Sequence, residues 1–150
     1  RCASEDGLAL CPLVGPDALP GLARQCEKFP QARVVIDHFA RIGVSGEFRA
    51  ADVDELGALA RFPHVRVKAS AYYAFGQKRA PYLDFAPLIR RLRDAFGAAR
   101  LMWGSDCPYQ IQRGHNYADA LALVRDRLDF LSATERDWLL RRTAEQTFFT

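Results

Sequence analysis

Short apolar runs alternate along this chain with longer segments in which apolar residues recur every three or four positions. The runs at residues 8–14, 33–37, 65–70 and 100–104 have the length and composition of buried strands. The segments at residues 17–29, 52–62, 85–96 and 117–130 have helical spacing, and Ser132-Ala-Thr-Glu135 is a capping box that opens a last helix. Four successive strand–helix units predict an α/β fold with a parallel sheet and right-handed crossovers.

Polar side chains follow three of the expected strands, and this favours a barrel over an open, doubly wound sheet. His38, Ser70 and Asp106 stand at or just beyond strand ends, where parallel barrels place their chemistry. The turn after the first strand, Gly15-Pro16-Asp17, does not match a dinucleotide fingerprint. A complete eight-unit barrel needs about 250 residues. We therefore expect residues 1–150 to form one partial domain: the C-terminal half of a (β/α)₈ TIM-like barrel, with four parallel strands alternating with helices plus a terminal helix.

The composition is that of a soluble globular domain, with 49% hydrophobic residues, 26% charged residues and a net charge of +3. The basic residues are scattered, so a nucleic acid is not an expected partner. A bilayer-spanning run of about 20 apolar residues is absent from the sequence. The four cysteines show no CxxC spacing, which predicts free thiols in a reducing cytoplasm. The expected partners are a small-molecule substrate and either a second copy of the chain or a missing N-terminal half.

Three segments carry a family likeness: Val-Val-Ile-Asp-His-Phe-Ala-Arg at residues 34–41, Val-Lys-Ala-Ser-Ala at 67–71, and Leu-Met-Trp-Gly-Ser-Asp-Cys-Pro at 101–108. In this order and spacing they resemble the amidohydrolase-related group of the amidohydrolase superfamily, which includes lactonases and some decarboxylases. The likeness extends from about Leu10 to Glu145. It implies a distorted (β/α)₈ barrel that is usually hydrolytic and often binds one divalent metal such as zinc.

The resemblance also assigns roles to two residues. It implies that Asp106 is a metal ligand or general base, and that His38 is a metal ligand or polarises a carbonyl group. The His-x-His pair that the family carries on its first strand would lie upstream of Arg1. The ligand set within this chain is therefore expected to be incomplete, because zinc takes three or four protein ligands.

The alternation of side chains along the expected strands brings several of these residues together. Lys68 and Ser70 share one strand face, as do Gly104 and Asp106, and His38 shares a face with Val34 and Ile36. We expect His38, Lys68, Ser70 and Asp106 to converge on one pocket. By the same count Asp37 points the opposite way and pairs with a group on a helix or loop.

Each of these residues also has a purely structural interpretation. Asp106 fits a general base or a turn aspartate before Pro108, and His38 fits a site residue or a hydrogen-bonded core histidine. We expect substrate binding by Arg41, Lys68, Ser70 and Tyr72. The alternatives are a solvated Arg41, an ion pair of Lys68 with a barrel carboxylate, and aromatic packing of Tyr72. Ser70 has no adjacent base and no nucleophile elbow, which argues against a serine hydrolase.

The favoured function is hydrolysis of a small carbonyl substrate, a lactone or a carboxylated ring. Asp106 activates the attacking water and His38 polarises the carbonyl group or holds a metal. Two alternatives stay open: a metal-dependent decarboxylase or hydro-lyase that uses the same residues, and a half-barrel without catalytic activity.

Overall fold

The computed structural model describes residues 5–149, and Cys2 lies outside them. Within the described part, four parallel strands form one sheet in chain order. They are β1 (Ala9–Leu10), β2 (Arg33–Ile36), β3 (Val65–Ala69) and β4 (Leu101–Trp103). Successive parallel strands are joined by helical crossovers, so the predicted α/β half-barrel with its four strand–helix units is confirmed.

Helices fill the connections between the strands. The α-helices are α2 (Leu19–Lys28), α3 (Ala50–Ala58), α4 (Ala86–Phe96), α5 (Tyr117–Ala122), α6 (Ala133–Asp137) and α7 (Thr143–Phe148). Short 3₁₀ turns extend several of them: η1 (Pro16–Ala18), η2 (Asp37–Arg41), η3 (Leu59–Arg61), η4 (Leu83–Phe85), η5 (Ala98–Arg100) and η6 (Tyr109–Ile111). The π-helical turns η7 (Leu123–Arg127) and η8 (Trp138–Arg142) continue α5 and α6. None of the helices in the described part has the length and apolar composition needed to cross a bilayer.

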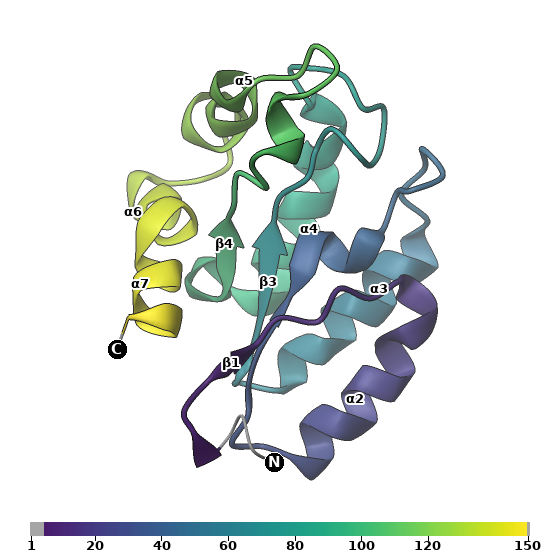
Figure 1. Cartoon of the computed structure of the whole chain (residues 1–150), viewed down its shortest axis with the longest axis vertical. Coiled ribbons are helices and arrows are strands. Elements are labelled where there is room, and N and C mark those ends of the chain that lie inside the picture. Colours follow the sequence, from purple (N-terminus) through teal and green to yellow (C-terminus); the bar gives the residue numbers. More distant parts are fainter. Residues whose placement is uncertain (1–4, 150) are drawn as a thin grey trace.

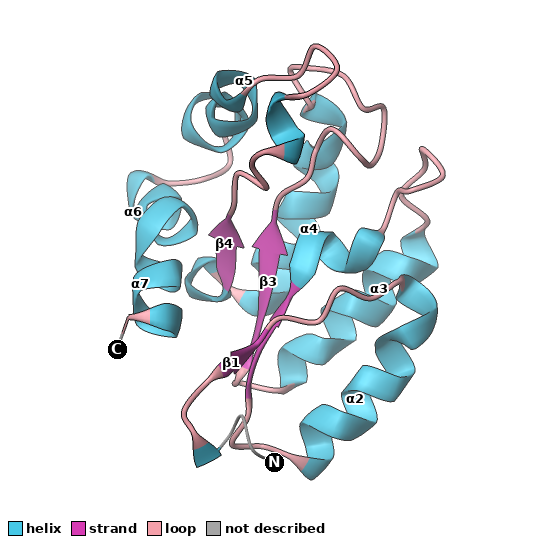
Figure 2. Ribbon diagram, viewed as in Figure 1, coloured by secondary structure: helices cyan, strands magenta, loops and turns pink. Residues whose placement is uncertain are grey.

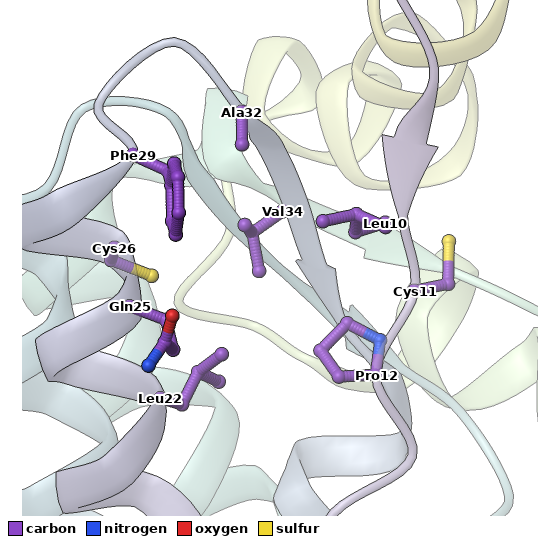
Figure 3. A pocket seen from close by; sticks show the side chains of 9 residues that line it. All are labelled: Leu10, Cys11, Pro12, Leu22, Gln25, Cys26, Phe29, Ala32 and Val34. Atoms are coloured by element: carbon purple, nitrogen blue, oxygen red, sulfur yellow. The ribbon is translucent and has the colours of Figure 1, made fainter. Parts of the chain in front are cut away.

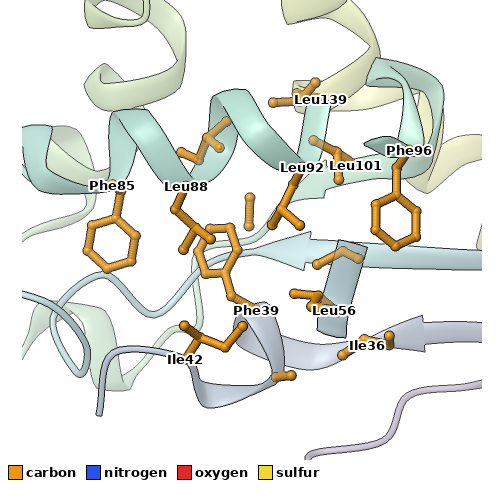
Figure 4. Close-up of a cluster of buried hydrophobic side chains, with 14 of the residues drawn as sticks. Ile36, Phe39, Ile42, Leu56, Phe85, Leu88, Leu92, Phe96, Leu101 and Leu139 are labelled. Carbon is orange, nitrogen blue, oxygen red and sulfur yellow. The ribbon is translucent and has the colours of Figure 1, made fainter. Parts of the chain in front are cut away.

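The helices cover one side of the sheet (Figures 1 and 2). Helices α2, α3 and α4 follow one another along it, and the α6–α7 region packs beside β4. The capping box is present, because the Ser132 hydroxyl accepts from the Glu135 N–H while the Glu135 carboxylate accepts from the Ser132 N–H. The core fills the space between sheet and helices (Figure 4), with side chains that include Ile36, Leu56, Phe85, Leu92 and Leu139.

Strand β1 is much shorter than the predicted strand at residues 8–14. Pro12 interrupts it, since proline has no N–H to donate to a ladder. The Pro12 carbonyl oxygen nevertheless accepts a hydrogen bond of 3.1 Å from the Asp37 N–H, so residues 11–14 run beside the end of β2 without forming a regular ladder.

The register shows which side chains point away from the helices. Val35 lies beside Arg66, and Lys68 beside Met102. Lys68 thus projects from the open face, as predicted, and Arg66 does so as well, while Val65, Val67 and Ala69 belong to the core. For β2 the prediction was wrong: Val34 and Ile36 face the helices, so strand alternation alone would bury His38.

Truncation of Leu92 tests the position of the core. Its side chain is fully buried on α4, so Leu92→Ala is expected to lower the free energy of unfolding by about 2–5 kcal/mol. Leu83→Ala, at a residue 49% exposed, is the matched control and is expected to cost less than about 1 kcal/mol. Chemical denaturation measures both, and equal losses would contradict this packing.

Candidate functional site

A left-handed turn at the end of β2 delivers His38 to the open face. The backbone φ angles of His38, Phe39, Ala40 and Arg41 lie between 48° and 57°, a region that costs L-residues energy. Burial of Phe39 and Ala40, at 1% and 0% exposure, holds the turn in place. Because the chain leaves the strand after Ile36, the His38 side chain lies on the open face. Regular strand alternation would have placed it on the helix-covered face.

The His38 ring contacts one residue with each nitrogen. Its Nδ1 lies 2.7 Å from the Ser70 Oγ, and its Nε2 lies 3.6 Å from the Asp106 Oδ1. Ser70 is fully buried at the end of β3, so its hydroxyl is a fixed partner that orients the imidazole ring. The Nε2 atom is left to face the carboxylate, and the side chains of His38 and Asp106 remain 16% and 20% exposed.

Asp106 lies in the loop after β4, also with a left-handed backbone, at φ 52°. Its carbonyl oxygen accepts hydrogen bonds from the N–H groups of Tyr109 and Gln110, at 3.0 and 3.2 Å. Backbone hydrogen bonds therefore stabilise the turn, and the Asp106 carboxylate is free to contact other side chains. Its Oδ1 faces His38, and its Oδ2 accepts a hydrogen bond of 2.7 Å from the Tyr73 hydroxyl.

Tyr73 is also a member of this cluster, although the sequence favoured Tyr72 as the substrate-binding tyrosine. It comes from the loop after β3, and burial raises the pKa of its hydroxyl, with the hydrogen bond to Asp106 raising it further. The hydroxyl is therefore protonated at neutral pH and donates. The sequence feature that indicates Tyr73 is its position three residues after Ser70, where the expected strand ends.

Lys68 and Asp37 form an ion pair on the open face. The prediction that Asp37 pairs with a helix or loop group was wrong, because Asp37, the first residue after β2, pairs with Lys68 of strand β3. The ion pair is the alternative that the sequence left open for Lys68. Gly104 lies next to it: a Cβ there would come within 3.2 Å of the Lys68 Cδ and 3.5 Å of the Ser70 Cβ. This close approach confirms that Lys68, Ser70 and Gly104 share a face.

Arg41 and Tyr72 lie outside this cluster. Arg41 is exposed and lines a polar hollow with Ser45, Glu47 and Arg49 among other residues. Tyr72 is fully buried among aromatic core side chains, and its hydroxyl donates to the Ala69 carbonyl oxygen at 3.1 Å. A fully buried hydroxyl that donates to the backbone is not accessible to a ligand. Tyr73, rather than Tyr72, contacts Asp106.

An apolar hollow of about 430 Å³ lies between β1 and α2 (Figure 3). Leu10, Leu22, Cys26 and Phe29 are among its lining side chains, and Gln25 is the one amide of the lining. Without charged groups it lacks the chemistry of the His38–Asp106 cluster. Cys11, Cys26 and Cys107 are free thiols, as predicted.

The donor atoms offer a metal ion part of a site. Two ligands of a tetrahedral zinc ion are about 3.4 Å apart, close to the 3.6 Å between His38 Nε2 and Asp106 Oδ1. Among residues 5–149, however, no group of three or more His, Cys, Asp or Glu side chains is arranged to hold a metal. Residues 5–149 thus place two suitable donor atoms near each other and hold no third in this arrangement.

Comparisons with known proteins place this chain in a family. L-fucono-1,5-lactonase of Burkholderia ambifaria is 38% identical over 109 residues, which are 72% of this chain and 37% of that protein. 4-Sulfomuconolactone hydrolase of Rhizobium radiobacter is 32% identical over 96 residues, 63% of this chain and 31% of that protein. This chain therefore matches well under half the length of these curated relatives.

Solved structures agree in fold. An amidohydrolase of Burkholderia multivorans with bound zinc superposes with a TM-score of 0.85 at 29% identity, over 97% of this chain and 54% of that one. A putative 2-pyrone-4,6-dicarboxylic acid hydrolase of Pseudomonas putida gives 0.82 at 30% identity, over 97% and 53%.

The family model described as Amidohydrolase matches residues 13–150. This span contains all three segments that carried the resemblance, and with them His38, Ser70 and Asp106. The chain belongs to the amidohydrolase family.

Proposed function

We propose that the complete protein hydrolyses a small lactone at the site formed by His38 and Asp106. The observation that carries this proposal is the convergence of His38 Nε2 and Asp106 Oδ1 at the carboxyl ends of β2 and β4. Support for the substrate class comes from the two named relatives, a sugar lactonase and a sulfomuconolactone hydrolase.

In the proposed reaction Asp106 acts as general base. Its Oδ1 takes a proton from water, and the water oxygen adds to the carbonyl carbon of the lactone. The ring C–O bond then breaks, and the proton passes to the departing ring oxygen, giving a hydroxy acid. His38, held by Ser70, places Nε2 where it can stabilise the developing charge on the carbonyl oxygen.

A divalent metal fits part of this site. His38 Nε2 and Asp106 Oδ1 would hold it, and the bound ion would supply a Lewis acid for the carbonyl group or the attacking water. The zinc in the Burkholderia multivorans structure supports this choice of metal. The Ser70 hydroxyl on Nδ1 would fix the ring for that purpose as well.

The remaining ligands are proposed to come from outside this chain. The matched solved structures are about twice as long, since this chain covers 54% and 53% of them. The open face supports the same view, because Arg66 Nε is shielded from solvent and has no hydrogen-bond partner in the part of the chain that the structure describes. A second half-barrel from the same protein would supply both acceptor and ligands.

We propose that Lys68 and Arg41 bind the substrate. Lys68 lies beside Gly104 on the open face, but Asp37 compensates its charge. Arg41 is exposed on the turn that carries His38, so its guanidinium is available to pair with a substrate carboxylate.

Replacement of the base is the first test. In the full-length protein, Asp106→Asn is expected to lower kcat for a sugar 1,5-lactone by about 10²–10⁴-fold, the usual contribution of a positioned base. The release of acid is followed with a pH indicator. Asp129→Asn is the control, because that side chain is 94% exposed and pairs with Arg90 at 3.8 Å. Wild-type turnover by Asp106→Asn would remove Asp106 from the mechanism.

The metal is tested by binding and by activity. Dialysis of the full-length protein against a chelator is expected to abolish turnover, and added Zn²⁺ to restore it. His38→Asn is expected to lower the zinc content measured by atomic absorption, since it removes one ligand. A protein that turns over lactone at an undiminished rate after complete removal of metal would exclude this part of the proposal. Release of carbon dioxide from a carboxylated ring would instead favour the decarboxylase alternative.

A further inference from the structure

We propose that Tyr73 is a positioning residue that fixes the orientation of the Asp106 carboxylate. The inference rests on the proposed function, since it concerns how the base of that site is held. It assigns to Tyr73 a task distinct from substrate binding and from core packing.

The contacts of the carboxylate motivate the assignment. Oδ2 accepts the hydrogen bond from Tyr73 at 2.7 Å, while Oδ1 faces His38 Nε2 at 3.6 Å. One oxygen is therefore engaged in a short hydrogen bond, and the other is presented to the site. Without Tyr73, rotation about the Cβ–Cγ bond would let the carboxylate of Asp106 turn away from His38.

The loop that carries Asp106 needs such support because its backbone is strained. Asp106 has a left-handed φ of 52°, and its own turn is closed by local hydrogen bonds from the N–H groups of Tyr109 and Gln110. Tyr73 adds a link from a different loop, the one after β3. A contact between two loops restrains their relative position, which local turn hydrogen bonds cannot do.

A second set of contacts joins the same two loops and keeps Tyr73 in place. The Tyr82 hydroxyl lies 2.7 Å from His115 Nδ1, and the buried Gln110 amide donates to that hydroxyl at 3.2 Å. The Tyr73 and His115 rings are in contact, with centroids 6.1 Å apart. The loops after β3 and β4 are thus joined at two points, and Tyr73 is the one that reaches the carboxylate.

The test compares two tyrosine-to-phenylalanine variants of the full-length protein. Tyr73→Phe removes the donor and keeps the ring. Tyr117→Phe is the matched control, since Tyr117 lies on α5, is 44% exposed and contacts the Trp103 ring. Hydrolysis of a sugar 1,5-lactone is measured at a temperature at which circular dichroism shows each variant folded. Asp106→Asn is assayed in parallel.

Tyr73→Phe is expected to lower kcat about 10- to 100-fold, the range seen when an orienting partner of a site residue is removed. KM should stay within about twofold, because an interaction that serves the reacting group acts on kcat. Tyr117→Phe should retain the wild-type kcat. The inference is overturned if Tyr73→Phe turns over at the wild-type rate, if its effect is confined to KM, or if the control loses as much. An inactive Asp106→Asn beside a fully active Tyr73→Phe would reject this inference alone, whereas an active Asp106→Asn would reject the proposed function.

Discussion

The contact between His38 and Asp106 is the feature on which the interpretation of this molecule depends. The two residues follow β2 and β4, which are not neighbours, since β3 lies between them. In a flat sheet such strands are about 10 Å apart. Side chains from both can meet by reaching toward each other across the open face, and the curvature of a barrel would shorten that distance. Ser70 follows β3, the strand between β2 and β4, and its hydroxyl lies 2.7 Å from Nδ1 of the imidazole ring.

Backbone strain is concentrated at the same place. His38 and Asp106 both adopt left-handed conformations that β-strands do not contain. Such conformations persist where the surroundings determine them, and they gather at functional sites. Here the surroundings are identifiable: the burial of Phe39 and Ala40 secures the first turn, and the hydrogen bond from Tyr73 accompanies the second. The free energy gained by core packing and loop contacts offsets the cost of the two left-handed backbone conformations that bring the His38 and Asp106 side chains together.

The sequence was informative about the fold because its signals are local. Apolar runs, helical spacing and the capping box at Ser132 each depend on residues close in the chain, and they placed all four strands. The face of Lys68 followed from simple alternation in a regular strand. The position of His38 could not be predicted in this way. Strand alternation gives the wrong face for the side chains of β2, and His38 reaches the open face through a left-handed turn that no local sequence pattern predicts. Tyr73 and the Lys68–Asp37 ion pair depend on the distance between loops and strands, which only the folded chain defines.

A crystal structure of the full-length protein with a hydroxy acid product of a sugar lactone bound would test the role of His38 and Asp106 most directly. We expect the product carboxylate to lie between His38 Nε2 and Asp106, within hydrogen-bond or metal-ligand distance of both, with Tyr73 still donating to Asp106. A product bound elsewhere, or His38 and Asp106 side chains that open onto opposite sides of the closed barrel, would contradict this role.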